Sequence, residues 1–267
     1  MSDSSETMRP TLSVVIITRN EERNIRKCLE SARWADEIVV VDACSSDRTI
    51  EVTKEYTSHV LVRPWPGFGP QKNYAIGQAS GEWVLVLDAD ERVSPELASE
   101  IQARLRGSDE SDVVAFRIPR RNMYYGRWVR WGGIYPDYQL RLFRKDSARY
   151  NDVAVHENLL VNGAMGTLTG HLDHYTEHAI SDHFTRFPQY TTLAAQEKAK
   201  TTRVVRWSDL VIRPLVVLTK TYVLKQGFRD GVRGMIVCIF ASMYTFVKYA
   251  KLWESLNVRS SRFAVRG

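Results

Sequence analysis

Two aspartates one residue apart follow a short apolar run in the first third of the chain. Residues 83–87 (Trp-Val-Leu-Val-Leu) contain no charged side chain and lead directly into Asp88, Ala89 and Asp90. Uninterrupted apolar runs of this length are typical of strands in parallel sheets that are covered on both faces. Carboxylates at the carboxyl end of such a strand lie where open α/β sheets bind ligands. Their hard oxygens suit Mg²⁺ or Mn²⁺ carrying a diphosphate, so the pair predicts a metal-assisted phosphate site.

The same stretch has a purely structural interpretation. Asp90 or Ser94 could cap the helix that we expect to start near Pro95, with Asp88 simply solvated. An isolated Asp-x-Asp sequence is not specific for either role. Its interpretation therefore depends on the polar residues that follow other predicted strands.

Two earlier predicted strands also end on polar residues. Residues 12–18 form an apolar run ending at Thr18, and residues 37–42 form a second run ending at Asp42. Helical patterns follow each of them, and a short strand over residues 59–62 precedes a helix over residues 71–79. This alternation predicts a parallel sheet with right-handed crossovers, whose strand ends meet at one edge. Alternatively, Asp42 caps the turn before Ser45.

The start of the predicted helix over residues 71–79 offers a second anion-binding feature. Lys72 and Asn73 lie in its first turn, where backbone amides favour anions and a lysine can reach a phosphate. Lys72 could equally be one more solvated charge. Competing motifs are missing, because the sequence contains no G-x-G-x-x-G after the first strand, no G-x-x-x-x-G-K-[ST] and no G-x-S-x-G. A dinucleotide oxidoreductase, a P-loop enzyme and a serine hydrolase are therefore disfavoured.

The alternation of strands and helices ends after a helix predicted over residues 95–105. Strands are expected over residues 112–118 and 138–144, and the loop over residues 122–133 between them is rich in aromatic residues and arginines. Such a loop could stack on sugars and pair with phosphates, or its rings could form a satellite apolar cluster.

Further along, two neighbouring residues could act as bases. His156 and Glu157 lie in a short apolar segment. Alternatively, Glu157 pairs with an arginine such as Arg117 or Arg141. Three histidines follow at spacings of three and four residues: His171, His174 and His178. A helix would place them on one face, where they could bind zinc. We favour instead a strand and a turn in which these histidines are structural.

Length and composition fit one large α/β domain with an appendage. The 267 residues are 44% apolar, and the three cysteines show no C-x-x-C spacing, which argues against a disulfide framework or a thiolate zinc site. The polar N-terminus lacks the apolar segment of a signal peptide. We therefore expect a cytoplasmic protein.

Basic residues are concentrated at the C-terminal end. Residues 199–267 contain 13 Lys and Arg against 3 Asp and Glu, whereas the first 198 residues contain 24 against 28. This contrast divides the chain into an α/β domain over residues 10–198 and a basic helical tail over residues 199–267. The apolar stripe expected over residues 235–247 suits an anionic membrane surface, and peripheral attachment to the inner face of the plasma membrane is expected. The alternative is a helical hairpin packed on itself or a homo-oligomer contact.

These segments resemble the nucleotide-sugar-dependent glycosyltransferases of family 2. The resemblance lies in residues 14–21 (Val-Val-Ile-Ile-Thr-Arg-Asn-Glu), 41–47 (Val-Asp-Ala-Cys-Ser-Ser-Asp) and 73–91, in this order and spacing. More narrowly, residues 141–144 (Arg-Leu-Phe-Arg), 155–157 (Val-His-Glu) and 227–231 resemble bacterial lipopolysaccharide core glucosyltransferases. The family implies the GT-A fold, which is Rossmann-like α/β with a mostly parallel central sheet and flanking helices, here followed by a C-terminal helical segment.

The resemblance implies roles for residues at the matching positions. Thr18 and Glu21 would line the base and ribose pocket, and Asp42 would take the uracil imide proton. Asp88 would hold the ribose or a metal-bound water, and Asp90 would ligate Mg²⁺ or Mn²⁺ on the diphosphate, with Asp88 as a possible second ligand. Other residues implied at the nucleotide-sugar site are Asn20, Ser45, Asp47, Lys72, Asn73 and Ala89.

A carboxylate further along the chain would deprotonate the acceptor hydroxyl. Glu157 is the first choice for this base, with Asp137 and Asp152 behind it. The resemblance thus implies an inverting transfer of a hexose from a nucleotide-diphosphate sugar, expected to be a UDP-sugar, to a glycan or glycolipid acceptor of the cell envelope, with no nucleic acid partner. The alternative is a catalytically silent GT-A-like binding or scaffold protein that uses its basic tail on lipid or nucleic acid.

Overall fold

The computed structural model describes residues 10–107, 112–151, 158–177 and 179–258. Contacts within the chain group these residues into two units. Unit 1 comprises the described parts of Met1–Arg121 and Asp137–His174, and unit 2 those of Asn122–Pro136 and Tyr175–Gly267. The division into domains over residues 10–198 and 199–267 stays a prediction.

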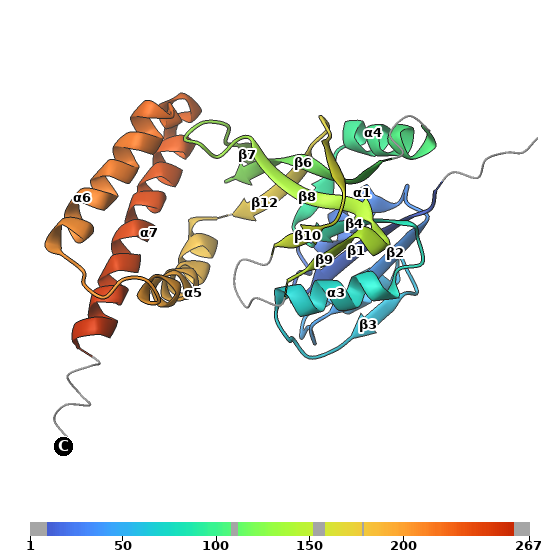
Figure 1. The fold of residues 1–267 in the computed structure, drawn as a ribbon, viewed down its shortest axis with the longest axis horizontal. Helices are drawn as coiled ribbons and strands as arrows, with labels where there is room; N and C mark the ends of the chain where they lie inside the picture. The colour runs from blue at the N-terminus through green and yellow to red at the C-terminus, as the bar shows by residue number, and fades with distance from the viewer. Residues whose placement is uncertain (1–9, 108–111, 152–157, 178, 259–267) are drawn as a thin grey trace, which may run out of the picture. The chain divides into compact units, whose positions relative to one another are not determined.

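Four parallel strands form the first half of the sheet in unit 1. Their order is β3-β2-β1-β4, and β1 pairs in parallel with both β2 and β4 (Figure 1). Thr18 lies opposite Asp42, and Ile17 lies opposite Asp88, so three strands end at the same level. The predicted parallel α/β architecture is confirmed. The strands are β1 (Leu12–Thr18), β2 (Glu37–Asp42), β3 (Val60–Val62) and β4 (Trp83–Asp88).

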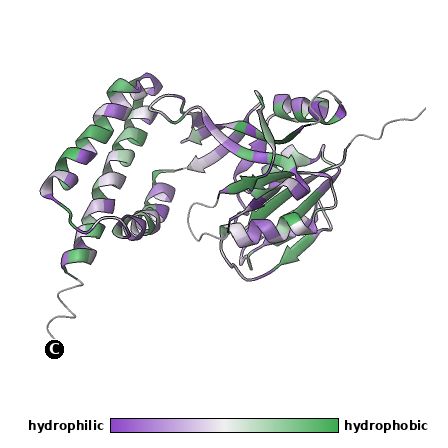
Figure 2. Ribbon diagram, viewed as in Figure 1, coloured by the Kyte–Doolittle hydropathy of each residue, from purple (hydrophilic) through white to green (hydrophobic). Residues whose placement is uncertain are grey.

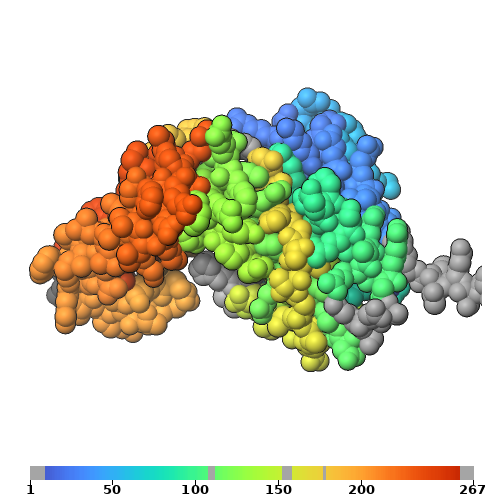
Figure 3. Space-filling model, turned by 90° about the horizontal axis from the view of Figure 1, so that it is seen from above, coloured from blue at the N-terminus to red at the C-terminus, as the bar shows by residue number. Residues whose placement is uncertain are grey.

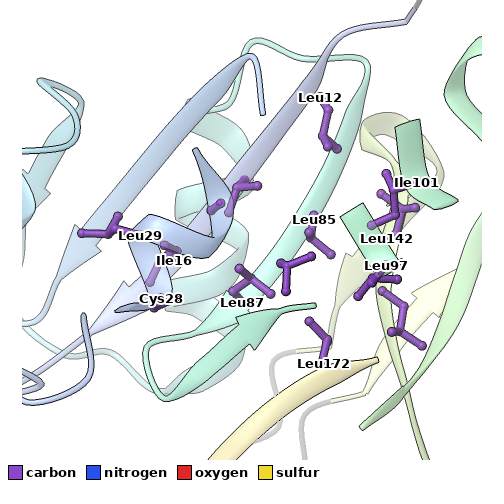
Figure 4. Close-up of a cluster of buried hydrophobic side chains, with 14 of the residues drawn as sticks. Leu12, Ile16, Cys28, Leu29, Leu85, Leu87, Leu97, Ile101, Leu142 and Leu172 are labelled. Carbon is purple, nitrogen blue, oxygen red and sulfur yellow. The ribbon is translucent and has the colours of Figure 1, made fainter. Parts of the chain in front are cut away.

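Helices cover both faces of these strands because successive strand residues point to opposite sides. Val14 and Ile16 of β1 join a cluster with apolar residues of α1 and α4, whereas Val15 and Ile17 join a second cluster with Ala75 of α3. Figure 4 shows labelled side chains of the first cluster, which extends from Cys28 and Leu29 of α1 across the sheet to Leu97 and Ile101 of α4. The helices are α1 (Ile25–Ala32), α2 (Thr49–Lys54), α3 (Phe68–Gln78) and α4 (Pro95–Arg106).

The second half of the sheet is mostly antiparallel. Strand β8 pairs antiparallel with β4, β6 pairs antiparallel with β8, and the order continues through β12 to β5. Strands β11 and β7 also pair with β6, and β9 and β10 form a separate pair. The strands are β5 (Glu91–Val93), β6 (Val113–Tyr124), β7 (Arg127–Trp128), β8 (Asp137–Arg144), β9 (Ala148–Tyr150), β10 (Leu159–Val161), β11 (Ala164–Thr167) and β12 (Leu172–Glu177), and η1 (Lys145–Ser147) precedes β9.

The histidine-rich segment is a strand, as we favoured. His174 lies within β12, and His171 precedes it, so these residues do not share a helical face. His178 lies outside the described residues.

Unit 2 is helical after β12, which confirms the expected C-terminal helical segment. Helices α6 and α7 lie side by side, and α5 packs against α7 (Figures 1 and 3). The elements are α5 (Ile180–Ala199), α6 (Trp207–Leu218), η2 (Thr219–Leu224), η3 (Gly227–Asp230) and α7 (Gly231–Asn257).

The central strand β4 should dominate the stability of unit 1. Leu85 is fully buried in the first cluster, and Leu85→Ala should lower the free energy of unfolding by roughly 2–5 kcal/mol because it removes packed methyl groups and leaves a cavity. Chemical denaturation measures this change. Val62→Ala, at an exposed position of the edge strand β3, should change it by less than about 0.5 kcal/mol. Equal effects of the two variants would contradict the assigned core.

Candidate active site

The loops that follow β1 and β2 are hydrogen-bonded to each other. The buried carboxylate of Asp42 accepts bonds from the backbone N–H (2.7 Å) and the hydroxyl (2.5 Å) of Ser45. The Ser45 hydroxyl in turn accepts a bond from the backbone N–H of Asn20 (2.7 Å), and Asn20 Oδ1 accepts one from Ser46 N–H (2.8 Å). Asp42 therefore caps the turn before Ser45, as the structural interpretation expected, and Asn20, Asp42 and Ser45 come together at one edge of the sheet.

A second set of bonds continues this connection. The Asp47 carboxylate accepts bonds from the backbone N–H groups of Glu22 (3.1 Å) and Thr49 (3.0 Å), and the Thr49 hydroxyl accepts one from Glu21 N–H (2.8 Å). Burial raises the pKa of Asp47, but the bonds from Thr49 and neighbouring amides outweigh it and lower the pKa below its usual value. The Glu21 carboxylate accepts a bond from the Asn24 amide (2.9 Å). Glu21 and Asp47 thus fix the loop backbones.

Buried polar atoms without partners lie near the same edge. Among the described residues, Thr18 Oγ1 and both amide atoms of Gln71 have no hydrogen-bond partner, and both side chains are buried. An unmet buried hydrogen-bonding group costs roughly 1–3 kcal/mol, so it marks a place where a ligand or water can bind. We did not predict Gln71, because nothing in the sequence indicates that this glutamine of the first helical turn is buried.

Asp88 ends β4 between two cations. Its carboxylate is 3.2 Å from Lys72 Nζ and accepts a hydrogen bond from the Arg141 guanidinium. Burial raises the pKa of Asp88, but the positive charges of Arg141 and Lys72 outweigh it and hold the pKa well below its usual range. Lys72 is itself buried, so it is not a solvated surface charge. The helix α3 begins at Phe68, so Lys72 lies in its second turn and not at the helix start as we predicted. Its ammonium group nevertheless contacts the end of β4 directly.

Glu91 links Asp88 to a larger charge network. This fully buried carboxylate is 2.9 Å from Arg141 and 3.2 Å from Arg120, and it accepts a bond from the backbone N–H of Asp88 (3.0 Å). Arg120 also pairs with Asp137 at 2.7 Å. Three carboxylates therefore face three cations in this network. Sequence reasoning missed Glu91, because its arginine partners come from strands whose pairing the sequence does not reveal.

Two further predicted residues have structural contacts. The Asn73 side chain donates to the backbone carbonyl of Tyr150 (2.8 Å) and accepts from its N–H (2.9 Å), so it joins α3 to β9. Asp137, a reserve candidate for the base, pairs with Arg120 and accepts a bond from Gln139 (2.7 Å). Glu157 and Asp152, the other candidates for the base, lie outside the described residues.

Asp90 lies beside a histidine rather than in the charge network. Asp90 Oδ2 is 3.4 Å from His174 Nε2, and both side chains are 14% exposed. The pairing of β12 with β5, which sets His174 opposite Glu91, brings them together. Sequence spacing gave no sign of this contact. Ser94 caps α4 by accepting a bond from Leu97 N–H (3.2 Å), so Asp90 is not the cap, and Ala89 between the two aspartates is buried.

This arrangement can be compared with the needs of a divalent cation. Among the described residues, no group of three or more His, Cys, Asp or Glu side chains could hold a metal by itself. Mg²⁺ in nucleotide sites usually takes one or two carboxylates and completes its shell with phosphate oxygens and water. Asp90 next to His174 fits that pattern. Asp88 fits it less well, because its two oxygens already face Lys72 and Arg141.

The aromatic loop over residues 122–133 engages other residues of unit 2. Asp230 accepts bonds from the backbone N–H groups of Arg130 (3.0 Å) and Trp131 (2.6 Å), and the Arg229 guanidinium lies 4.0 Å from the Trp131 ring centroid. These contacts agree with the packing interpretation of the loop.

The Asp88 ion pairs predict an acid-dependent loss of stability. Because its pKa is depressed in the folded state, Asp88 stabilises the fold above the ordinary aspartate pKa of about 3.9, and this contribution is lost as the pH falls below that value. Asp88→Asn should cost roughly 2–3 kcal/mol at pH 7, less than a fully buried pair because the side chain is 31% exposed.

Urea denaturation at pH 7 and at pH 3.5 measures this effect. The difference between Asp88→Asn and the wild type should shrink at the lower pH. Asp146→Asn, which changes an exposed aspartate of η1, serves as the control and should have little effect at either pH. A cost for Asp88→Asn that does not change with pH would contradict the assigned ion pairs.

This chain is similar in sequence to known glycosyltransferases. The family model described as Glycosyl transferase family 2 matches residues 13–159. The chain is 30% identical to the lipopolysaccharide core biosynthesis glycosyltransferase LpsC of Rhizobium meliloti, over 91% of this chain and 92% of that protein. It is 27% identical to an uncharacterized glycosyltransferase of Rickettsia typhi, over 93% and 88% of the two chains.

A solved structure of Staphylococcus aureus TarS in complex with UDP is similar with a TM-score of 0.47 and 17% identity, covering 94% of this chain and 92% of that one. The predicted α/β fold of the GT-A class is confirmed, and β3-β2-β1-β4 form the parallel half of its central sheet. The family model covers more than half of the chain, and the 30% identity to LpsC extends over 91% of it. This chain therefore belongs to glycosyltransferase family 2.

Proposed function

We propose that this glycosyltransferase moves a hexose from a UDP-sugar to a hydroxyl of a glycan or glycolipid during synthesis of lipopolysaccharide core or a related cell-envelope glycan. The relationship to LpsC supports the acceptor class. The observation that carries the proposal is the strand register, which brings Thr18, Asp42 and Asp88 to one edge of the sheet. A nucleotide, a diphosphate and a cation need three different kinds of polar group, and this edge offers them.

The loops after β1 and β2 are the proposed nucleotide site. Asp42 is already anchored by Ser45, so in this proposal it accepts a hydrogen bond from the imide N–H of uracil without reorganising. The unpartnered Thr18 hydroxyl and Gln71 amide are the further groups that a bound nucleoside can satisfy. In this proposal Asn20, Ser45 and Asp47 shape the site, and Glu21 lines the ribose.

The end of β4 is the proposed diphosphate site. Asp90, with His174 beside it, would hold Mg²⁺ or Mn²⁺, which when bound acts as a Lewis acid on the diphosphate leaving group. Asp88 is held in place by Arg141 and Lys72, so it can orient the ribose or a water molecule.

The proposed transfer is inverting. The acceptor hydroxyl gives its proton to Glu157 and attacks the anomeric carbon from the face opposite the nucleotide, and the bond to the diphosphate oxygen breaks. Glu157 is preferred to Asp137, because the Asp137 oxygens are engaged by Arg120 and Gln139.

A direct test uses hydrolysis of the donor. Incubated with a panel of labelled UDP-sugars and Mn²⁺ but no acceptor, the wild type should slowly release UDP from one of them. Asp90→Ala should stay folded and lose about 10²-fold or more of this rate, because the charge on the leaving diphosphate is no longer stabilised. Asp146→Ala, the exposed control, should keep the wild-type rate.

Two results would contradict the proposal. Full activity of Asp90→Ala, or of the wild type in excess EDTA, would remove the metal role. No hydrolysis or transfer by the wild type with any sugar of the panel would favour a catalytically silent binding protein.

The general base is tested separately. Glu157→Gln removes the group that takes the proton but keeps the size of the side chain. The rate of sugar transfer to an acceptor should therefore fall by about 10²- to 10⁴-fold. The affinity for UDP, measured by calorimetry, should be unchanged. Wild-type transfer by this variant would place the base at another residue.

A further inference from the structure

Helix α7 exposes a continuous apolar stripe. Six of its large apolar side chains are between 38% and 66% exposed, and they recur at intervals of three, four or seven residues, so they share one face of the helix. No charged residue interrupts this face between its ends. The stripe consists of Val232, Met235, Ile239, Met243, Phe246 and Trp253.

The neighbouring helix α6 adds to the exposed apolar surface. Trp207, Val211 and Leu215 lie four residues apart along one side of α6, and each is at least half exposed. Figure 2 shows hydrophobic residues along both helices. Soluble proteins rarely leave apolar surface of this extent in contact with water, and such surfaces usually mark interaction sites.

The other faces of α7 already have partners inside unit 2. Phe240 stacks on His183 of α5 with ring centroids 3.8 Å apart, and Lys251 Nζ donates to the carbonyl of Pro188 (2.7 Å). On the side toward α6, the Arg213 guanidinium lies 5.1 Å from the ring centroid of Tyr249. The stripe is therefore a surface left over after the helices have packed, and not the core of unit 2.

Exposed cations lie in the segments that flank the two helices. The connection between α6 and α7 carries Lys220, Lys225 and Arg229, all exposed, and Arg206 precedes α6. Residues 199–267 together contain 13 Lys and Arg against 3 Asp and Glu. We propose that the hairpin formed by α6, α7 and their connection (residues 207–257, the α6–α7 hairpin) lies in the interface of an anionic lipid bilayer. Its apolar side chains would lie at the acyl boundary and its cations among the headgroups.

The charge pattern favours a bilayer over a second copy of this chain. Two copies meeting at this surface would bring strongly positive segments together, and like charges repel. A nucleic acid would match the charge but not the apolar stripe. The proposal does not depend on the catalytic role of Asp90 or Glu157.

The hairpin should lie along the membrane and not cross it. Gly227–Asn257 is long and apolar enough for a span by length and composition. However, the uncharged part between Arg233 and Lys248 covers residues 234–247, about 21 Å at 1.5 Å per residue, whereas the hydrocarbon core is about 30 Å thick. The contacts of α7 with α5 and α6 also occupy faces that a spanning helix would turn to lipid.

Vesicle sedimentation tests the proposal with the full chain. Wild type should sediment with vesicles containing phosphatidylglycerol, bind pure phosphatidylcholine vesicles far less, and be released by high salt or alkaline carbonate. The double variant Ile239→Glu/Met243→Glu should have at least about tenfold lower affinity for the anionic vesicles, because it places two carboxylates on the stripe. Leu160→Glu, at an exposed apolar position of β10, is the matched control and should bind as the wild type does.

Circular dichroism shows whether each variant is folded, and analytical ultracentrifugation reports self-association. The proposal is overturned if wild type does not bind anionic vesicles, or if the folded double variant binds them as well as the control does. It is also overturned if the stripe variant only dissociates a dimer, or if wild type resists carbonate extraction as a spanning protein does.

Discussion

A balanced cluster of buried and partly buried charges at the end of β4 determines how the site is built. Asp88, Glu91 and Asp137 face Lys72, Arg120 and Arg141, and these six residues come from α3, β4, β5, β6 and β8. Buried charges are tolerated when each is paired, and removing one partner leaves another uncompensated. The network therefore couples the strand order, including the antiparallel strands β8 and β6, to the position of a single carboxylate.

This network separates the two aspartates of the Asp-x-Asp sequence. Asp88 is ionised and fixed by two cations, whereas Asp90 points to His174 outside the network. An aspartate that already faces two cations is a poor ligand for a third, whereas Asp90 lies outside this network. In the proposed reaction, Asp88 therefore orients the donor and Asp90 holds the metal. Glu91 supports the position of Asp88, because it contacts Arg141 and accepts a hydrogen bond from the backbone N–H of Asp88.

Local sequence predicted the parallel half of the fold well. The apolar runs ending at Thr18, Asp42 and Asp88 are β1, β2 and β4, because a strand buried on both faces needs an uninterrupted apolar run. The capping of the turn at Ser45 was also open to prediction, since Asp-x-x-Ser is a local pattern.

Long-range pairing explains what the sequence did not reveal. The contact between Asp90 and His174 depends on the register of β12 against β5, and the partners of Glu91 depend on β8 lying next to β4 and β6 lying next to β8. Gln71 escaped notice because burial of a helix-start glutamine depends on how α3 sits on the sheet. The loop over residues 122–133 contains the end of β6 and the strand β7, which pair antiparallel with each other.

Coupling between UDP and metal binding tests the central claim most directly. Calorimetric titration of the wild type with UDP, in the presence and absence of Mn²⁺, measures how far each ligand strengthens the other. The convergence of the three strand ends predicts UDP affinity that rises at least about tenfold with Mn²⁺, and a coupling that disappears in Asp90→Asn while metal-free UDP binding remains. UDP that binds equally well with and without Mn²⁺, or does not bind at all, would contradict a shared nucleotide and metal site at this edge of the sheet.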